Sequence, residues 1–453
     1  MDRREFLKAT GAGAATLGVA ACKEAATKAG IDPSRSDQGP GAMEMRTNPN
    51  SGDRVSILGY GCMRWQMKKD AEGRDVVDQD SVNELVDYAI AHGVNYFDTS
   101  PVYLQGQSEE ATAKALLRHP REKYFIATKM SNFQGHSADA SLRMYHRSFE
   151  IFQTDRMDYY LLHSLSGEGD FKRRFLDNGM IDFLMAEREA GRIRNLGFSF
   201  HGPVAGFDYM MSLHEKYHWD FVQIQMNYVD WHHAQGRNVN ASYLYDELQK
   251  RGIPVVIMEP LLGGRLSNVP GPVATRLKEH APGKSIASWA FRFCGTYPGV
   301  LTALSGMTYM EHLSDNCDTY CHFKPLTDEE LALLEEMALM IRDFPLIDCT
   351  ACNYCMPCPY GIDIPTVFAH YNKCLNEGNV MNDIGTDSEE KRAFRKSRRA
   401  FLVGYDRAVP SFRQADHCIG CNHCVSECPQ GINIPEQMQR INDYVETLKQ
   451  SLA

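Results

Sequence analysis

The 453-residue sequence has few features of a membrane-spanning or nucleic-acid-binding protein. After the N-terminus, no apolar run approaches the roughly 18 residues that a transmembrane helix requires. Positive charge is not in excess, because 58 acidic residues outnumber 48 basic ones and give a formal net charge of −10. This balance argues against a general nucleic-acid binder. Hydrophobic residues make up 43% and charged residues 23%, close to the globular average, which excludes general disorder.

Cysteine is scarce in most of the chain. Of the 14 cysteines, five lie in the first 348 residues and nine lie between Cys349 and Cys428. Such local enrichment predicts a metal-binding or disulfide-bonded module joined to a cysteine-poor body. The length of the chain allows two or three domains.

The N-terminus resembles an export signal. Arg3 and Arg4 precede a mild apolar stretch rich in Gly and Ala, and residues 1–22 resemble a twin-arginine (Tat) signal. The stretch ends in Val-Ala-Ala-Cys, which resembles a lipoprotein box with Cys22 as the lipid acceptor. We therefore expect an exported protein, periplasmic or membrane-anchored facing the periplasm; an ordinary amphipathic helix is the alternative. Residues 23–45 predict a flexible linker.

From residue 46 onward, short β-branched or aromatic runs alternate with helical patterns such as Ser81–His92 and Ser285–Cys294. Eight such repeats predict an α/β fold, a (β/α)8 TIM barrel, over residues 46–323. A doubly wound sheet is the alternative, but the Gly-rich dinucleotide turn that it needs after its first strand is missing. The predicted strands are Arg54–Tyr60, Val94–Asp98, Tyr124–Lys129, Tyr159–His163, Ile193–Ser199, Phe221–Asn227, Pro254–Glu259 and Val300–Ser305.

Four ionisable residues fall at or near adjacent predicted strand ends. Asp98, Lys129 and His163 end the second, third and fourth strands, and Tyr103 lies five residues after Asp98. Taken singly, each has a structural explanation, such as a hydrogen-bonded core histidine at position 163. Because barrel enzymes place their chemistry at the C-terminal ends of strands, the group of four predicts a catalytic site.

The stretches Asn95–Tyr103, Ile126–Lys129 and Asp158–Ser164 resemble the aldo-keto reductase family, and the resemblance covers roughly residues 50–320. It implies an NAD- or NADP-dependent oxidoreductase that interconverts a carbonyl and an alcohol on a small molecule. In this comparison Tyr103 donates the proton and Lys129 lowers the pKa of that phenol from its usual value of about 10. Asp98 would hold Lys129 charged, and His163 would orient the carbonyl.

The same resemblance implies contacts to the cofactor. Ser199 and Gln223 match positions that hold the nicotinamide carboxamide, although each also suits a structural role as a strand-end polar residue. Met258 replaces an aromatic residue under the nicotinamide. Gly306 and His312 stand where basic residues often bind the 2′-phosphate, which leaves the choice between NAD and NADP open. The candidate cofactor-binding residues are Ser199, Gln223, Gly263, Gly264, Arg265, Ser305 and Asn316.

The C-terminal cysteines form two runs that each end in Cys-Pro. The second run matches the bacterial ferredoxin pattern, and the first is one residue shorter. The stretches that follow the two runs, residues 360–365 and 430–435, are near-copies of each other, which supports a pseudo-twofold pair of clusters. The resemblance implies a smaller ferredoxin-like dicluster domain with helices over residues 346–453, after a connecting helix at 324–345.

In ferredoxins the fourth cysteine of a run ligates the other cluster. Zinc and disulfides are the alternatives, but eight cysteines with two Cys-Pro endings favour iron–sulfur. The resemblance therefore assigns one [4Fe-4S] cluster to Cys349, Cys352, Cys355 and Cys428, and the other to Cys418, Cys421, Cys424 and Cys358.

Together these features predict an exported aldo-keto-reductase-like enzyme fused to a dicluster domain. Tat exports folded proteins, which suits clusters that are assembled before export. Nicotinamide moves two electrons whereas each cluster moves one, and no flavin motif is seen, so the clusters are either structural or linked to a redox partner.

The basic run at residues 391–399 is either a docking face or a solvated helix face. The alternative function is an electron-transfer protein whose barrel is a non-catalytic docking scaffold.

Overall fold

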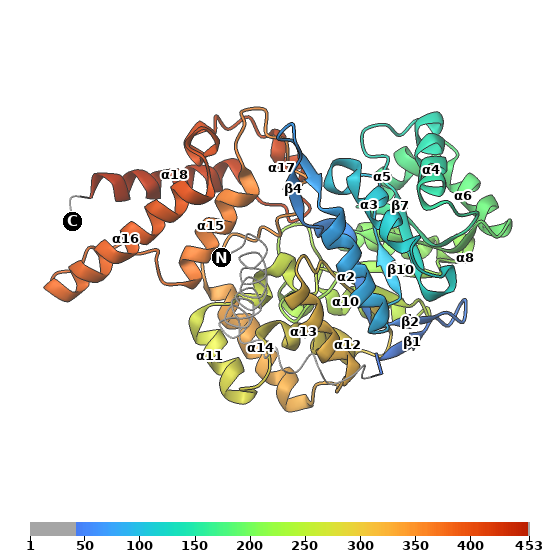
Figure 1. Cartoon of the computed structure of the whole chain (residues 1–453), viewed down its shortest axis with the longest axis horizontal. Helices are drawn as coiled ribbons and strands as arrows, with labels where there is room; N and C mark the ends of the chain where they lie inside the picture. Colours follow the sequence, from blue (N-terminus) through green and yellow to red (C-terminus); the bar gives the residue numbers. More distant parts are fainter. Residues whose placement is uncertain (1–41, 452–453) are drawn as a thin grey trace, which may run out of the picture.

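The computed structural model describes residues 42–451 (Figure 1). Eight parallel strands close into a barrel in the order β3-β6-β7-β8-β9-β10-β11-β12, which confirms the predicted fold. The predicted Tat signal, the Cys22 lipid site and most of the predicted linker lie outside the described residues. The barrel strands are β3 (Leu58–Gly61), β6 (Tyr96–Asp98), β7 (Phe125–Met130), β8 (Met157–Leu165), β9 (Ile193–Phe200), β10 (Phe221–Gln225), β11 (Val255–Met258) and β12 (Val300–Ser305).

The first predicted strand is divided in two. Its beginning, β2 (Arg54–Ser56), pairs in antiparallel fashion with β1 (Met45–Thr47), and only β3 joins the barrel. The division follows from Ser56, whose backbone N–H donates to Asn95 Oδ1 at 2.8 Å and whose hydroxyl donates to the Leu58 carbonyl at 2.7 Å. These bonds, one to the distant Asn95 and one within the segment, accompany the turn of the chain between β2 and β3.

The β1–β2 hairpin closes the N-terminal end of the barrel. The hydroxyl of Tyr159 and the amide of Asn195 donate to Asp53 Oδ2 at 3.2 and 3.1 Å. Inside the barrel, apolar and aromatic side chains fill the space above this polar layer, among them Tyr96, Phe221 and other residues of one buried cluster. The interior is therefore a packed core, which leaves only the C-terminal end for a site.

Helices between the strands cover the outside of the barrel. They bury one face at helical spacing, as α4 does with Tyr145, Ser148 and Phe152. A short antiparallel hairpin, β4 (Met67–Lys69) with β5 (Asp75–Val77), follows β3. No helix among residues 42–451 is long and apolar enough to cross a membrane. The main helices of this layer are α2 (Gln79–Ala91), α3 (Gln107–Leu116), α4 (Ala138–Phe152), α6 (Met180–Glu189), α7 (Val204–Ser212), α10 (Ala241–Gln249), α11 (Gly271–His280), α12 (Ile286–Thr296) and α13 (Met310–Cys321).

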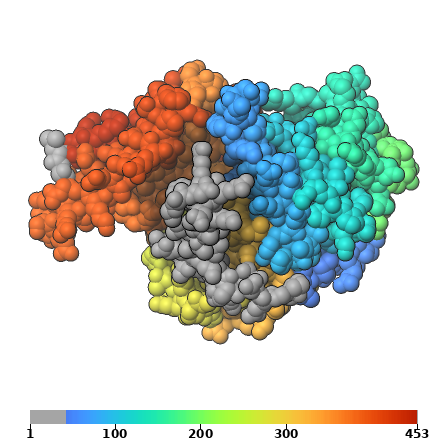
Figure 2. Space-filling model, in the orientation of Figure 1, coloured from blue at the N-terminus to red at the C-terminus, as the bar shows by residue number. Residues whose placement is uncertain are grey.

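After the barrel, α14 (Asp328–Asp343) starts at a capping box between Thr327 and Glu330 and leads to the remaining residues. Residues 346–451, named the cluster region below, form a second hydrophobic core that includes Phe368, Phe401 and Met438. The region extends from one side of the barrel (Figures 1 and 2). Its helices are α15 (Ile364–Asn376), α16 (Ser388–Ala408), α17 (His423–Glu427) and α18 (Ile434–Gln450).

The internal repeat marks two equivalent helix starts. Asp363 and Asn433 are the N-cap residues of α15 and α18, and each helix has proline in its first turn. The Asp363 side chain accepts a hydrogen bond from the Thr366 N–H at 3.4 Å. Each cysteine run is therefore followed by a helix with an Asp or Asn N-cap residue and proline in its first turn, and of the two only Asp363 makes a side-chain cap bond.

Candidate active site and cluster-binding cysteines

The four predicted catalytic residues meet at one end of the barrel. Asp98 ends β6, whereas Lys129 and His163 lie one and two residues before the ends of β7 and β8. Tyr103 begins the 3-10 turn Tyr103–Gly106. Because the carboxyl ends of parallel strands share one edge, residues distant in sequence converge there. The structure thus brings all four side chains to the mouth of the barrel.

Lys129 is fixed by a buried ion pair. Its Nζ donates to Asp98 Oδ1 at 2.5 Å and to the Thr99 carbonyl at 2.7 Å. The Lys129 side chain is 0% exposed, and its Nζ lies 4.9 Å from the centroid of the Tyr103 ring. Burial raises the pKa of the Asp98 carboxyl and lowers the pKa of the Lys129 ammonium, while the ion pair opposes both shifts. The pair holds one amino group against the face of the phenol.

The pKa of Tyr103 differs from the sequence-based expectation. Burial raises the pKa of the phenol well above 10, and Tyr354 and the Asp98 carboxylate add to the rise. The expected lowering of the Tyr103 pKa by Lys129 is not found. Asp98 pairs with the Lys129 ammonium and weakens its attraction for a phenolate, and the cost of burying a phenolate away from water exceeds the attraction that remains. In this structure Tyr103 is therefore a protonated acid at neutral pH.

His163 is held in a neutral state. Its Nδ1 lies 2.6 Å from Ser131 Oγ, and its ring meets that of Tyr103 edge-on with 5.7 Å between the centroids. Burial lowers the pKa of the imidazole well below 6.5, and the positive charges of Lys129 and Arg174 lower it further. Sequence reasoning missed Ser131. Its position two residues after Lys129 was an available signal, because alternate residues along a strand share a face.

A cavity of about 830 Å³ opens beside these residues. Its volume is within the range of small-molecule and cofactor sites. Asp98, Tyr103 and His163 line the cavity, and so do Met258 and His312. Six of the seven candidate cofactor contacts line it as well, namely Ser199, Gln223, Gly263, Gly264, Ser305 and Asn316.

The cavity residues fit the carboxamide end of a nicotinamide. Gln223 Oε1 is buried and has no hydrogen-bond partner among residues 42–451, so it can accept from an amide N–H₂. Ser199, the neighbouring candidate on β9, is fixed because its Oγ accepts from the Ser164 N–H at 2.7 Å. On the other side, the Asn316 amide donates to Ser305 Oγ at 3.0 Å. The donor and acceptor set therefore suits the cofactor.

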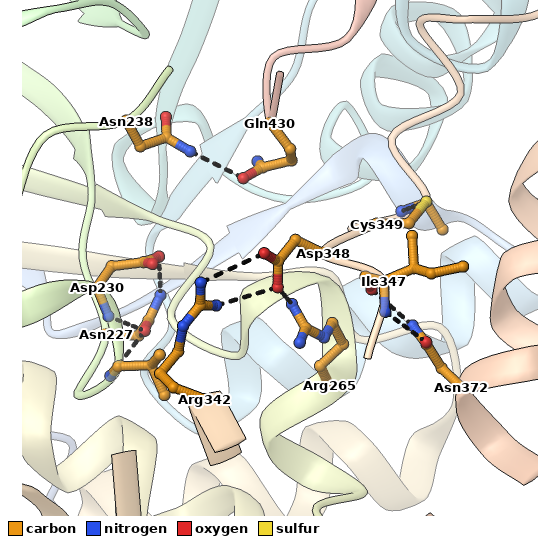
Figure 3. A network of polar contacts seen from close by, with 12 residues as sticks. Asn227, Asp230, Asn238, Arg265, Arg342, Ile347, Asp348, Cys349, Asn372 and Gln430 are labelled. Carbon is orange, nitrogen blue, oxygen red and sulfur yellow. Dashed lines mark hydrogen bonds and ion pairs between the residues drawn. The ribbon is translucent and has the colours of Figure 1, made fainter. Parts of the chain in front are cut away.

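Arg265 does not reach this cavity. Its Nη1 donates to Asp348 Oδ1 at 2.7 Å, and Arg342 approaches the same oxygen at 3.1 Å (Figure 3). The arginine predicted to contact the pyrophosphate is thus engaged with the cluster region. No local pattern indicated this contact, because Asp348 lies 83 residues away along the chain.

The cluster region covers part of the barrel mouth. Gln430 accepts from the Asn238 amide at 2.8 Å (Figure 3) and donates to Gln225 Oε1 at 3.2 Å. Arg64 donates from Nη2 to the Thr350 carbonyl at 2.5 Å. Through these contacts the region completes the wall of the catalytic cavity. The residues that it contributes are Thr350, Cys352, Tyr354, Pro429 and Gln430.

The predicted cluster ligands gather in two groups, each with one cysteine from the other run. Cys349, Cys352, Cys355 and Cys428 line one small, mostly apolar cavity. Cys358, Cys418 and Cys421 surround Cys424, and burial followed by these neighbours raises the pKa of that thiol to about 11. Four thiols around an apolar cavity suit a [4Fe-4S] cluster, whose iron displaces the protons on binding.

The two groups differ in exposure. Burial raises the pKa of Cys349 to about 11 and that of Cys352 to about 12, whereas Cys421 of the second group is exposed. Among residues 42–451, no three His, Cys, Asp or Glu side chains converge closely enough to bind a single metal ion. The first group lies against the barrel, because Cys352 lines both its own cavity and the catalytic one.

Comparison with known proteins identifies both parts of the chain. Residues 57–338 match the aldo/keto reductase family. The chain belongs to this family. Residues 348–433 of this aldo/keto reductase match the 4Fe-4S dicluster domain, which decides in favour of two [4Fe-4S] clusters over zinc. The predictions of a nicotinamide-dependent oxidoreductase and of an iron–sulfur module are thereby confirmed at the level of the family and the domain.

Relatives of known name resemble mainly the barrel. L-galactose dehydrogenase from Arabidopsis thaliana is 24% identical over 327 residues, which cover 66% of this chain and 94% of that protein. D-arabinose 1-dehydrogenase from Saccharomyces cerevisiae is 31% identical over 134 residues, 28% of this chain and 36% of that protein. A solved aldo-keto reductase from Klebsiella pneumoniae in complex with NADPH superposes with a TM-score of 0.52 at 21% identity. It covers 65% of this chain and 96% of its own length.

Proposed function

We propose that this aldo/keto reductase interconverts a carbonyl group and an alcohol on a small polyhydroxylated molecule, with NAD or NADP as the hydride carrier. The observation that carries the proposal is the meeting of Tyr103, His163 and the Lys129–Asp98 pair at the wall of one cavity. A proton donor, a neutral hydrogen-bonding imidazole and a buried ammonium are the groups that carbonyl reduction requires.

Each side chain has a role that follows from its surroundings. When bound, the nicotinamide supplies the hydride to the carbonyl carbon or accepts it from the alcohol carbon. Tyr103 is protonated and gives its proton to the oxygen that becomes negative during reduction. His163 is neutral and held at Nδ1 by Ser131, so its Nε2, which contacts the Tyr354 hydroxyl at 3.3 Å, can hydrogen-bond that oxygen when the substrate takes the place of this hydroxyl. Lys129, fixed by Asp98, stabilises the phenolate that remains.

The polar wall of the cavity supports a polyhydroxylated substrate. Arg64 and Glu259 from the barrel and Gln430 from the cluster region all line the cavity, although Arg64 and Gln430 also bind neighbouring protein groups. Such side chains can hydrogen-bond several hydroxyl groups at once. Two named relatives, an L-galactose dehydrogenase and a D-arabinose 1-dehydrogenase, carry sugar names, which favours an aldose for this chain.

We further propose that the two clusters occupy the two mixed groups of cysteines and exchange electrons with a redox partner through the second group. The support is exposure: Cys421 of the second group is exposed, whereas Cys352 of the first lines the catalytic cavity. A partner in solution can therefore approach the second group at short range through Cys421. In the alternative function, electron transfer with a non-catalytic barrel, the clusters exchange electrons in the same way, but Tyr103 has no role.

The variant Tyr103→Phe tests the proposed function. We expect a loss of about 10²–10⁴-fold in kcat/KM for aldose oxidation with NAD or NADP, because the variant lacks the group that transfers the proton. Activity is measured on anaerobically purified protein together with iron and sulfide content, which two [4Fe-4S] clusters set at about eight of each per chain.

Tyr88→Phe is the matched control. It also removes one phenolic hydroxyl, which here contacts Ser314 at 3.4 Å away from the cavity, and it should keep full activity. If no carbonyl or alcohol is turned over by the wild type, yet the clusters exchange electrons with a partner, the docking-scaffold function replaces the one proposed here.

A further inference from the structure

Tyr354 connects the cluster region to the catalytic residues. In sequence it lies between Cys352 and Cys355, two of the cysteines assigned to the first cluster. In space it lines the catalytic cavity of the barrel. The contact with His163 joins residues that are 191 positions apart, so nothing in the local sequence points to it.

The hydroxyl of Tyr354 occupies a defined position in the site. It lies 3.3 Å from Nε2 of His163, the imidazole nitrogen that Ser131 does not hold. The Tyr354 ring packs against Phe133 and His163, with 6.3 and 6.4 Å between the ring centroids. Tyr354 also lies close enough to Tyr103 to contribute to the raised pKa of that phenol.

These contacts are the ones that a substrate oxygen needs. During reduction, the carbonyl oxygen must reach both the hydroxyl of Tyr103 and Nε2 of His163. The Tyr354 oxygen already contacts Nε2 and faces Tyr103, and two oxygen atoms cannot share that place. A substrate therefore competes with Tyr354 for the same hydrogen-bond partners.

The backbone around Tyr354 is held by the barrel. Arg64 donates to the carbonyls of Thr350 and Ala351 at 2.5 and 3.4 Å. Ala351 and Asn353 both adopt left-handed backbone angles, with φ of 50° and 65°. Because Arg64 holds the two carbonyls just before Cys352, the segment cannot withdraw the Tyr354 side chain without a cost in free energy.

We propose that Tyr354 is a specificity-determining residue: its hydroxyl occupies the substrate-oxygen position, so the site accepts only ligands whose other contacts offset its displacement. The inference rests on the proposed function and deepens it. A polyhydroxylated substrate gains further hydrogen bonds from polar groups of the cavity wall, such as Glu259, when it displaces Tyr354, whereas a simple carbonyl compound gains none. Specificity is the difference between these two affinities.

Acetate is a suitable probe, because its oxygens can hydrogen-bond Tyr103 and His163 but it offers no further hydroxyl groups. We expect Tyr354→Ala to tighten acetate binding to the NADP-loaded holoprotein by about tenfold or more, measured by calorimetry. Tyr354→Phe keeps the ring packing and removes the competing oxygen, so a smaller gain of about threefold is expected. In turnover, Tyr354→Ala should raise kcat/KM for a simple aldehyde relative to an aldose.

Tyr360→Ala is the matched control. Tyr360 follows the same cysteine run, is 47% exposed and does not line the catalytic cavity, so acetate binding should stay unchanged. Iron and sulfide analysis shows whether each variant retains its clusters. Unchanged or weaker acetate binding in both Tyr354 variants, with clusters intact, would overturn the proposal.

The two proposals fail in different ways. If the wild type turns over no carbonyl or alcohol, the proposed function fails, but acetate binding still reports whether Tyr354 occupies the oxygen position. If Tyr354→Ala loses turnover of every substrate as Tyr103→Phe does, Tyr354 transfers protons instead of competing with substrate, and the specificity role is rejected.

Discussion

Among single residues, burial controls the chemistry of the candidate site. Lys129, Asp98 and His163 have 0%, 2% and 3% of their surface exposed. Burial disfavours every charged form, so His163 is neutral and Tyr103 stays protonated, whereas Lys129 and Asp98 combine opposite charges in an ion pair. A phenolic acid with a neutral imidazole beside it is suited to give a proton to a carbonyl oxygen.

The raised pKa of Tyr103 predicts an asymmetric pH dependence. Reduction needs the protonated phenol, so its kcat/KM should be constant between about pH 6 and 9. Oxidation needs the phenolate, whose fraction rises about tenfold per pH unit below the pKa, so oxidation should accelerate across the same range. Both directions are measured with one substrate pair and one cofactor.

Burial lowers the pKa of His163 well below 6.5. We therefore expect neither pH profile to show an inflection near pH 6.5. A plateau of the oxidation rate below pH 9 would contradict the raised pKa of Tyr103. In that case the bound cofactor, with Lys129, lowers the pKa as the sequence comparison implied.

At the scale of elements, the loops after the barrel strands carry the contacts to the cluster region. Gly236, in the loop between α9 (Asp230–His233) and α10, has a φ of 68°, and a Cβ there would collide with the Gln430 carbonyl oxygen. Gly252, at the other end of α10, has a nearly equal φ of 67° and no atom within 4 Å of a Cβ. The two glycines need the same backbone conformation but differ in their surroundings.

Alanine at these two glycines should separate backbone strain from domain contact. Both variants lose about 1–2 kcal/mol to the left-handed backbone and should lower the midpoint of thermal unfolding. Only Gly236→Ala also displaces the segment of Gln430, two residues after Cys428, and should therefore speed the release of iron to a chelator. Equal iron release from the two variants would show that the contact does not hold the cluster region.

The strands were predicted from periodicity, and β12 has the predicted ends, but several other ends differ. β8 extends two residues past the predicted end at His163, and β2 separates from β3 at Ser56. The alternation of apolar residues depends on the pleat of each strand and is visible in the sequence. The position where a strand ends depends on partners such as Asn95, which come from elsewhere in the fold.

At the scale of the whole molecule, the ion pairs of Asp348 connect the cluster region to the barrel. Arg265 and Arg342 have side chains only 12% and 13% exposed, and Asp348 is their shared carboxylate. Because two partly buried guanidinium groups converge on one oxygen, we expect this contact to contribute more to stability than an exposed ion pair does.

Removal of this carboxylate should weaken the contact between the two parts. Asp348→Ala leaves both arginines without their shared partner and should destabilise the holoprotein by about 1–3 kcal/mol. This change in stability is measured as a shift in the urea concentration at which the cluster absorption is lost. Asp75→Ala removes an exposed ion pair with Lys69, 61% and 63% exposed, and should leave the transition in place. A shift of equal size in both variants would show that Asp348 makes no special contribution.

The sequence by itself determined the barrel, the position of Asp98, Lys129 and His163 at neighbouring strand ends, and the two cysteine runs. These features follow from periods of two and 3.6 residues and from short spacings, which are local properties of a chain. Only the tertiary structure decided that Arg265 binds Asp348 and that Tyr354 enters the catalytic cavity. Both contacts join residues far apart in sequence, and they depend on how the surface of the cluster region fits the mouth of the barrel.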